Sequence, residues 1–275
     1  MESSVDVVEH YRGKRVVVTG CHSGIGHATA GLLVAAGAEV YGFDIKPADL
    51  ALAGFDALDL RDPRSIEAAA ISVGGPIDAL FNCAGVSHAL PPLEVMKVNF
   101  IGARYLTELL LPAMGPGSAV VSVASNGGAG WPHNLALLKQ LTATVSFDAA
   151  ADWYLANSAA AKAAYSFSKE ALIVWTMQAS TALIARGIRI NCTTPGAVQT
   201  PMLEQIEALT SAAVIDVVAQ PIGRRSSSEE QAWPLLFLNS AAASYVNGAV
   251  LPVDGGFLSA RAMDDIASQT PVGRS

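Results

Sequence analysis

The 275-residue sequence predicts an α/β fold, a doubly wound parallel sheet in a single domain. Three observations support this fold class. Apolar, β-branched runs alternate with segments of helical periodicity along most of the chain, as in parallel sheets with helices on both faces. The first such run leads through a glycine-rich turn into a helix. Hydrophobic residues make up 51% of the chain, which suffices for one sizeable core.

The predicted elements follow in a regular order. The strand RVVVTG (15–20) leads into a helix that stops at Gly37, where glycine is a common C-cap. Further strands are predicted at 38–44, 55–60, 76–82, 117–125, 187–196 and 247–256. Helices are predicted from Pro63, across 93–111 until Pro112 ends it, and across 159–186. The tail 257–275 is predicted to be loosely ordered.

Composition excludes several classes of protein. Acidic residues outnumber basic ones 24 to 17, and no stripe of lysine or arginine forms, so we expect no nucleic-acid binding. Long uncharged stretches are interrupted by Gly, Pro, Asn and Ser, so we expect no membrane span. The polar, acidic N-terminus is unlike a signal peptide, which predicts a cytoplasmic protein. The three cysteines lack CxxC spacing and paired histidines, which argues against metal or disulfide sites.

The turn TGCHSGIG (19–26) predicts a nucleotide site. Its glycines, Gly20, Gly24 and Gly26, permit a tight turn and let backbone amides at a helix N-terminus approach a pyrophosphate. A glycine-rich turn without a ligand is the plainer alternative. The flanking strand and helix, with an acidic residue ending the second strand, favour the nucleotide site.

Asp44 is that acidic residue, and it predicts the choice of cofactor. A carboxylate there can accept hydrogen bonds from an adenosine ribose diol and would repel a ribose phosphate, which favours NAD over NADP. His22 and Ser23 supply no fixed positive charge, in agreement, whereas the nearby Lys46 points the other way. A helix cap is the alternative role for Asp44.

The segment YSFSK (165–169) sets a phenol and an ammonium on one face of a predicted helix, four positions apart. A free phenol has a pKa of about 10, too high for efficient proton abstraction near neutral pH. A positive charge about 4 Å away is expected to lower it by roughly three units. A solvated pair on an exposed helix face is the alternative.

Together these motifs resemble the short-chain dehydrogenase/reductase family, over roughly residues 14–256. NCAG (82–85), a helix asparagine and PGAVQTPM (195–202) follow in the family's order. The resemblance implies a Rossmann fold that binds NAD. It implies Tyr165 as general acid/base, Lys169 as its pKa-lowering partner and ribose ligand, and Asn99 as the holder of a relay water. It implies a homo-oligomer, either dimer or tetramer.

The resemblance also assigns residues to the cofactor and none to a metal. Asp59 fits an adenine contact, and Thr200 fits a contact to the nicotinamide carboxamide. The full implied set is Gly20, Ser23, Gly24, Ile25, Gly26, Asp44, Asp59, Leu60, Asn82, Ala84, Gly85, Tyr165, Lys169, Pro195, Gly196, Val198 and Thr200.

The reaction also needs a hydrogen-bond donor on the substrate oxygen, where charge builds. Ser125, at the end of its predicted strand, matches the family's catalytic serine, whereas the rival Ser122 sits mid-strand. Ser125 and Tyr165 are 40 positions apart because a segment at about 128–157 is inserted. Both of its runs, NLALLKQL and AAADWYLAN, look helical. This helical insertion could shape the substrate pocket, block a subunit contact, or do both.

The insertion, with PIGRR (221–225) and ASYVNGAVLPVDGG (243–256), is most similar to the bacterial 3α-hydroxysteroid dehydrogenase/carbonyl reductase branch of the family. An apolar pocket for a hydrophobic alcohol or ketone follows as a hypothesis, with packing against the core as the alternative. Its candidate lining residues are Leu203, Ile206, Leu209, Trp131, Trp153 and Tyr154. Arg224 and Arg225 either bind an anionic substrate or, more simply, flank the helix that follows.

Two classes of function stay open. The first is an NAD-dependent oxidoreductase acting on a hydrophobic secondary alcohol and its ketone, or on another small cyclic or aryl alcohol. The second is a nucleotide-binding sensor or scaffold without turnover, for which the complete set Ser125, Tyr165, Lys169 and Asn99 would serve no chemical need. A halohydrin lyase is a third class, against which the intact glycine turn and Asp44 argue.

Overall fold

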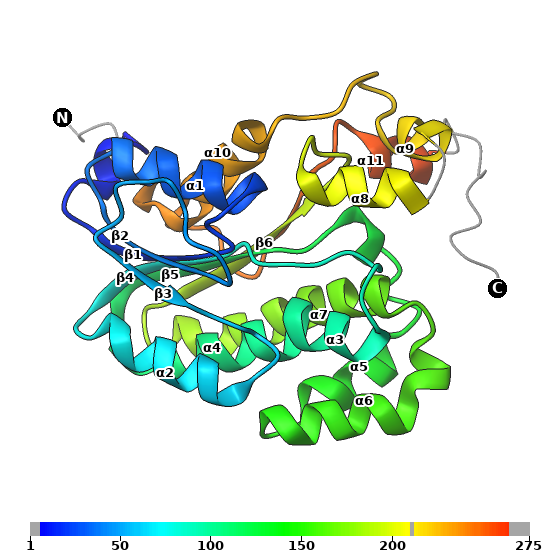
Figure 1. The fold of residues 1–275 in the computed structure, drawn as a ribbon, viewed down its shortest axis with the longest axis horizontal. Coiled ribbons are helices and arrows are strands. Elements are labelled where there is room, and N and C mark those ends of the chain that lie inside the picture. Colours follow the sequence, from blue (N-terminus) through cyan, green and yellow to red (C-terminus); the bar gives the residue numbers. More distant parts are fainter. Residues whose placement is uncertain (1–5, 210–211, 264–275) are drawn as a thin grey trace.

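A computed structural model describes residues 6–209 and 212–263. Within them, seven parallel strands form one twisted sheet in the order β3-β2-β1-β4-β5-β6-β7 (Figure 1). The strands are β1 (Arg15–Thr19), β2 (Glu39–Asp44), β3 (Gly54–Ala57), β4 (Ile77–Asn82), β5 (Met114–Val123), β6 (Arg189–Pro195) and β7 (Val250–Val253). The predicted doubly wound parallel sheet is confirmed.

Helices cover both faces of this sheet. On one face lie α1 (Gly24–Ala35) and α10 (Ser228–Asn239), and on the other α2 (Pro63–Val73), α4 (Ala103–Leu110) and α7 (Ala164–Ile184) (Figure 1). The strand β1 shows how the sequence serves both faces. Val16 and Val18 belong to the core on the α1 side, and Val17 belongs to the core on the α7 side, as the two-residue period of a strand requires.

The strand register brings the carboxyl ends of four strands to one edge of the sheet. Thr19 of β1 lies beside Asn82 of β4, Asn82 beside Ser122 of β5, and Ser122 beside Cys192 of β6. This edge carries α8 (Pro201–Leu209), α9 (Ala212–Val218) and α11 (Phe257–Ala262) above it in Figure 1. Ligands of open α/β sheets bind at such an edge.

Two of the predicted helices are not continuous in the structure, so these predictions are wrong in that respect. The helix expected across 93–111 divides into α3 (Pro92–Met96), a π-helical segment (Lys97–Gly102) and α4, with Pro112 inside a short 3-10 helix that follows. The helix expected across 159–186 is two helices. The insertion helix α6 (Phe147–Ala161) ends before Lys162, whose φ of 42° is incompatible with a right-handed helix, and α7 begins at Ala164.

The insertion forms the two helices that its sequence predicts, α5 (Leu135–Thr142) and α6, and extends to Ala161. They form an outer layer beneath α7 and α3 (Figure 1). Trp153 stacks on Phe167 of α7, with ring centroids 6.5 Å apart, and Tyr154 is only 2% exposed. These two aromatic residues therefore pack the insertion against the core, and the expectation that they line a substrate pocket is not supported.

The other differences are small. The predicted strand 55–60 ends at Ala57, and the one predicted at 117–125 runs from Met114 to Val123. Residues Phe257–Ala262 of the predicted loose tail are helical, and the rest of that prediction, 264–275, lies outside the described residues.

The described residues contain no helix with the length and hydropathy to cross a membrane. Among the same residues, no group of histidine, cysteine and carboxylate side chains could hold a metal ion, and all three cysteines are free.

Candidate active site

The glycine turn between β1 and α1 leaves no room for side chains. Gly20 and Gly24 have φ of +73° and +58°, a region that L side chains rarely adopt. A Cβ on Gly20 would lie 2.8 Å from the Ala84 backbone, and one on Gly26 would lie 2.1 Å from the Gly20 carbonyl oxygen. Thr19 fastens this arrangement, because its hydroxyl accepts hydrogen bonds of 3.1 Å from the amides of Cys83 and Ala84.

The helix α1 starts at this turn, and its N-cap Ser23 makes no side-chain capping bond. Its first amides therefore need another acceptor, and a helix N-terminus attracts negative charge. The turn fits the pyrophosphate of a dinucleotide on these grounds.

Asp44 lies beside the turn at the carboxyl end of β2. Its carboxylate accepts hydrogen bonds from the backbone amides of His22, at 3.0 Å, and Lys46, at 3.2 Å. The segment between Asp44 and β3 contains no helix, so the helix-cap alternative is wrong. A ribose diol could donate hydrogen bonds to this half-buried carboxylate in competition with the two amides.

Asp59 follows β3 on the same edge, next to the buried Leu60. Its carboxylate is held by Arg61, with a shortest contact of 2.7 Å, and this hydrogen-bonded cation lowers the pKa of Asp59. The expected adenine contact stays a prediction. Arg61 is a neighbour that the sequence analysis did not consider.

Ser125 and Tyr165 meet on the other side of the sheet edge. Ser125 lies two residues past β5, and its hydroxyl accepts a hydrogen bond of 3.1 Å from the Gly127 amide. Tyr165 lies in the first turn of α7 and is half-buried. A Cβ on Gly127 would lie 3.4 Å from the Ser125 hydroxyl oxygen and 3.5 Å from a ring carbon of Tyr165, so the two side chains are neighbours. Ser122, the rival, is fully buried and lies 3.4 Å from the Asn82 amide nitrogen. Only Ser125 is placed beside Tyr165.

Lys169 lies one helical turn after Tyr165 and is 4% exposed. Its ammonium donates a hydrogen bond of 2.9 Å to the Val123 carbonyl and lies 5.9 Å from the centroid of the Tyr165 ring. Burial lowers the pKa of Lys169 to about 8. The lysine is thus a buried amine at the centre of the site.

The expected lowering of the tyrosine pKa is wrong for this structure. Burial raises the pKa of Tyr165, and the nearby Ser125 hydroxyl only partly offsets the rise. The i, i+4 spacing predicted the neighbourhood of Lys169 but not the desolvation, which disfavours the charged form of a phenol.

Asn99 lies in the π-helical segment, a feature that is frequent at functional sites. Its side chain exchanges hydrogen bonds with the backbone of Val86, of 2.8 and 3.0 Å, and its amide donates to Ser168 at 3.2 Å. A Cβ on Gly85 would lie 3.3 Å from the Asn99 oxygen and 3.5 Å from the Lys169 nitrogen. Asn99, Gly85 and Lys169 therefore converge, and the relay-water role of Asn99 stays a prediction.

The loop after β6 brings the start of α8 to the site. Gly196 approaches the Asp254 backbone, and the buried Val198 bridges to Ser226. The Thr200 methyl lies 3.2 Å from the position of a Cβ on Gly24, so the loop reaches the glycine turn. The Met202 methyl lies 4.0 Å from a Cβ on Gly85 and covers the site from α8. Met202 was missed, although it ends the PGAVQTPM motif. The side chain of Leu209 lies outside the described part of the chain.

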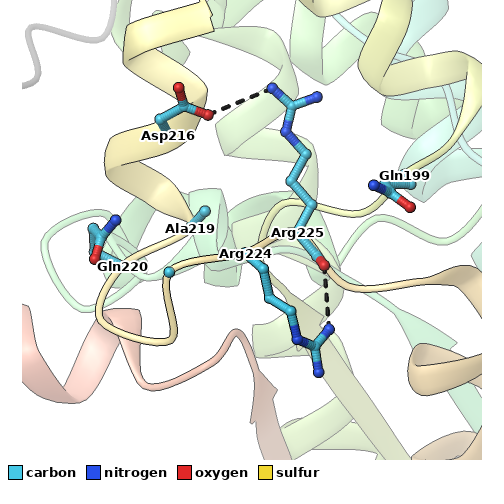
Figure 2. A pocket seen from close by; sticks show the side chains of 7 residues that line it. Gln199, Asp216, Ala219, Gln220, Arg224 and Arg225 are labelled. Atoms are coloured by element: carbon cyan, nitrogen blue, oxygen red, sulfur yellow. Dashed lines mark hydrogen bonds and ion pairs between the residues drawn. The ribbon is translucent and has the colours of Figure 1, made fainter.

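A polar cavity of about 530 Å³ lies between α9 and the segment before α10 (Figure 2). It is lined by Gln199, Asp216, Ala219, Gln220, Gly223, Arg224 and Arg225. Arg225 pairs with Glu207 of α8 and, at 3.5 Å, with Asp216 of α9. Arg224 pairs with Glu230 in the first turn of α10, at 2.6 Å. Both arginines are engaged by carboxylates, and Arg224 flanks the helix that follows, as the simpler alternative predicts.

Comparison with known proteins agrees with this geometry. A family model described as short chain dehydrogenase matches residues 14–136, and one described as enoyl-(acyl carrier protein) reductase matches residues 142–258. Coniferyl-alcohol dehydrogenase of Pseudomonas sp. (strain HR199 / DSM 7063) is 38% identical over 90% of this chain and 97% of its own length. The 3-alpha-hydroxysteroid dehydrogenase/carbonyl reductase of Comamonas testosteroni is 33% identical over 88% and 95%, respectively.

A solved structure of a relative has a similar fold. The 3-alpha-hydroxysteroid dehydrogenase of Pseudomonas sp. B-0831, complexed with NADH, superposes with a TM-score of 0.78 at 30% identity. The match covers 94% of this chain and 100% of that one. The likeness to hydroxysteroid dehydrogenases that the sequence predicts is confirmed. On the matches over residues 14–136 and 142–258 and on these relatives, the chain belongs to the short-chain dehydrogenase/reductase family of oxidoreductases.

Proposed function

We propose that the protein interconverts a hydrophobic secondary alcohol and its ketone with NAD as the cofactor. The observation that carries this proposal is the meeting of Ser125, Tyr165 and the buried Lys169 at the sheet edge that also holds the glycine turn. Such a set offers a proton acceptor and a hydrogen-bond donor to one substrate oxygen, next to a dinucleotide cradle.

In this proposal each side chain has one task. A bound nicotinamide supplies the acceptor for the hydrogen that leaves the carbinol carbon with its electron pair. Tyr165 takes the alcohol proton, and the Ser125 hydroxyl donates a hydrogen bond to the oxygen as charge changes there. Because the pKa of the Tyr165 phenol is raised, we expect alcohol oxidation to speed up as the pH rises and ketone reduction to be favoured at lower pH.

NAD rather than NADP is the proposed cofactor. The half-buried Asp44 carboxylate ends β2 beside the turn, where a 2′-phosphate would meet a negative charge. The relative solved with NADH supports the same choice. Asp44→Ala should weaken NAD binding and narrow the preference over NADP, which separate titrations of the two cofactors would measure.

The relatives suggest two substrate classes. The hydroxysteroid dehydrogenases support cyclic secondary alcohols with a large apolar frame. A second candidate, a phenolic primary alcohol oxidised to its aldehyde, is favoured by the 38% identity to coniferyl-alcohol dehydrogenase.

The test is nicotinamide absorbance with NAD and NADP in turn, against a panel of hydroxysteroids, simpler cyclic alcohols and phenolic primary alcohols. We expect turnover with NAD that falls by about 10² to 10⁴ in Tyr165→Phe, since the variant lacks the group that takes the proton. Tight NAD binding without turnover on the whole panel would favour the sensor alternative. Turnover that survives in Tyr165→Phe would refute the assigned chemistry.

A homo-oligomer, dimer or tetramer, remains a prediction from family membership. Light scattering after size exclusion measures it directly.

A further inference from the structure

A second buried ionisable group lies on α7 directly after the lysine of the site. Glu170 is 5% exposed, and its carboxylate accepts a hydrogen bond of 2.7 Å from the side-chain amide of Asn134. Burial raises the pKa of Glu170, and the bond from Asn134 works against that rise. A carboxylate is rarely buried in a protein unless it is hydrogen-bonded or paired with another group.

Asn134 ends a series of turns that starts at Ser125. The Gly128 amide donates to the Ser125 carbonyl at 3.0 Å, the Trp131 amide donates to Gly128 at 3.2 Å, and the Asn134 amide donates to Trp131 at 3.2 Å. The insertion helix α5 follows at once. The segment 125–134 is therefore a hydrogen-bonded unit with Ser125 at one end and the partner of Glu170 at the other.

This unit lies directly on the backbone of α7. A Cβ on Gly128 would lie 3.0 Å from the Lys169 carbonyl carbon, and a Cβ on Gly130 would lie 2.7 Å from a carboxylate oxygen of Glu170. The two glycines allow this close approach. A cavity of about 210 Å³ lined by Asn134, Ser166 and Glu170 borders the contact, so the segment has room to shift when the contact is lost.

We propose that Glu170 is a positioning residue, whose hydrogen bond with Asn134 holds the segment of Ser125 against the helix of Tyr165. The two hydroxyls then face the same substrate oxygen. This inference rests on the proposed function. Small misplacements of reacting groups by distant changes can cost large factors in rate.

The experiment compares Glu170→Ala, Glu170→Gln, Asn134→Ala and the double variant Glu170→Ala/Asn134→Ala, with Asp152→Ala on the exposed face of α6 as control. We expect kcat for alcohol oxidation to fall by about tenfold in Glu170→Ala, with the KM for NAD unchanged. Glu170→Gln keeps an acceptor for Asn134 and should recover most of the lost kcat. The double variant should lose no more than either single one, because both remove the same contact.

Affinity for NADH and the unfolding temperature are measured for every variant, so that loss of folded protein is separated from loss of position. If Glu170→Ala does not fold, Asn134→Ala, which truncates the half-buried partner, carries the test. An unchanged kcat in the truncated variants, or Glu170→Gln no better than Glu170→Ala, would overturn the proposal. Failure of the proposed function is distinct, since it would show as turnover that is absent in the unaltered protein or independent of Tyr165.

Discussion

The cofactor side and the substrate side of the site are built in different ways. On the cofactor side, the backbone itself makes the surface, and Cβ atoms added at Gly20 and Gly26 would lie only 2.8 and 2.1 Å from neighbouring main-chain atoms. On the substrate side, side chains make the contacts. Ser125 reaches Tyr165, Lys169 reaches the Val123 carbonyl, and Arg225 reaches the acids of α8 and α9.

This difference indicates where the site can tolerate substitutions. A surface made of backbone atoms cannot accept an added side-chain atom unless the chain moves. A single substitution there should therefore disrupt cofactor binding as a whole. A surface made of side chains can be altered one contact at a time, and substitutions there should give graded effects. Substrate range can therefore vary on the second side while the first is kept.

The largest effect on cofactor binding is expected at Gly26. Its added Cβ in Gly26→Ala would lie 2.1 Å from the Gly20 carbonyl oxygen, so the turn must shift. At about 1–3 kcal/mol for such overpacking, NAD affinity should fall by up to about 100-fold. Calorimetry or NADH fluorescence measures this loss.

Gly31→Ala in the same helix is the matched control. A Cβ there would meet only Leu50, at 3.8 Å. We expect unchanged NAD affinity and a gain in stability of about 0.5–1 kcal/mol from helix propensity. Equal effects of the two substitutions would contradict the backbone-defined cradle.

Lys169 tests the cost of burying a charge where the two sides meet. Its pKa falls from 10.5 to about 8, so between these values the unfolded chain binds more protons and the free energy of unfolding rises with pH. Below about pH 8 the full cost of roughly 3 kcal/mol is present. Near neutral pH, Lys169→Met should therefore be more stable to unfolding than the unaltered protein. The gain should be smaller than this cost, because the variant also loses the hydrogen bond to the Val123 carbonyl. The gain should disappear as the pH approaches 10.5.

Urea unfolding at both pH values measures the effect, with the exposed Lys139→Met as control. Turnover by Lys169→Met should be nearly abolished. A variant that is less stable than the unaltered protein at neutral pH and no worse at high pH would show that the buried charge is not costly.

The smallest effect is expected at the contacts of Arg225 with α8 and α9. Arg225→Ala removes the contacts to Glu207 and Asp216, all partly exposed. Arg224→Ala removes the contact to Glu230 and a hydrogen bond to the Arg225 carbonyl. Ion pairs of this kind contribute about 0–1 kcal/mol, so the KM for the alcohol should rise by at most about fivefold in Arg225→Ala. It should not rise in Arg224→Ala. A larger change in Arg224→Ala would mean that the contact with α10, rather than the contacts with α8 and α9, controls substrate binding.

The parts that could be predicted from the sequence depend on local chemistry. Glycine spacing reports a backbone constraint within eight residues, and alternating patterns report the strands and helices of the sheet. The break at Lys162 could not be predicted, because the surrounding alanines favour a helix and only tertiary packing sets a φ of 42° there. The π-helical segment around Asn99 leaves no signature in the pattern either.

Other features depend on contacts between distant residues. Asn134 and Glu170 are brought together only by the fold of the insertion, and Met202 only by the placement of α8. The direction of the Tyr165 pKa follows from burial, which spacing does not report. The candidate residues of the site could therefore be named from the sequence, whereas their contacts and burial could not.

The central claim is that this edge of the sheet moves hydrogen between an alcohol carbon and a nicotinamide. It is tested most directly with an alcohol that carries deuterium on the carbinol carbon, incubated with NAD, followed by mass spectrometry of the cofactor. The account predicts that the deuterium is recovered in the reduced cofactor and that NADH formation slows relative to the unlabelled alcohol. Deuterium that stays in the alcohol, with NAD bound and unreduced, would contradict it.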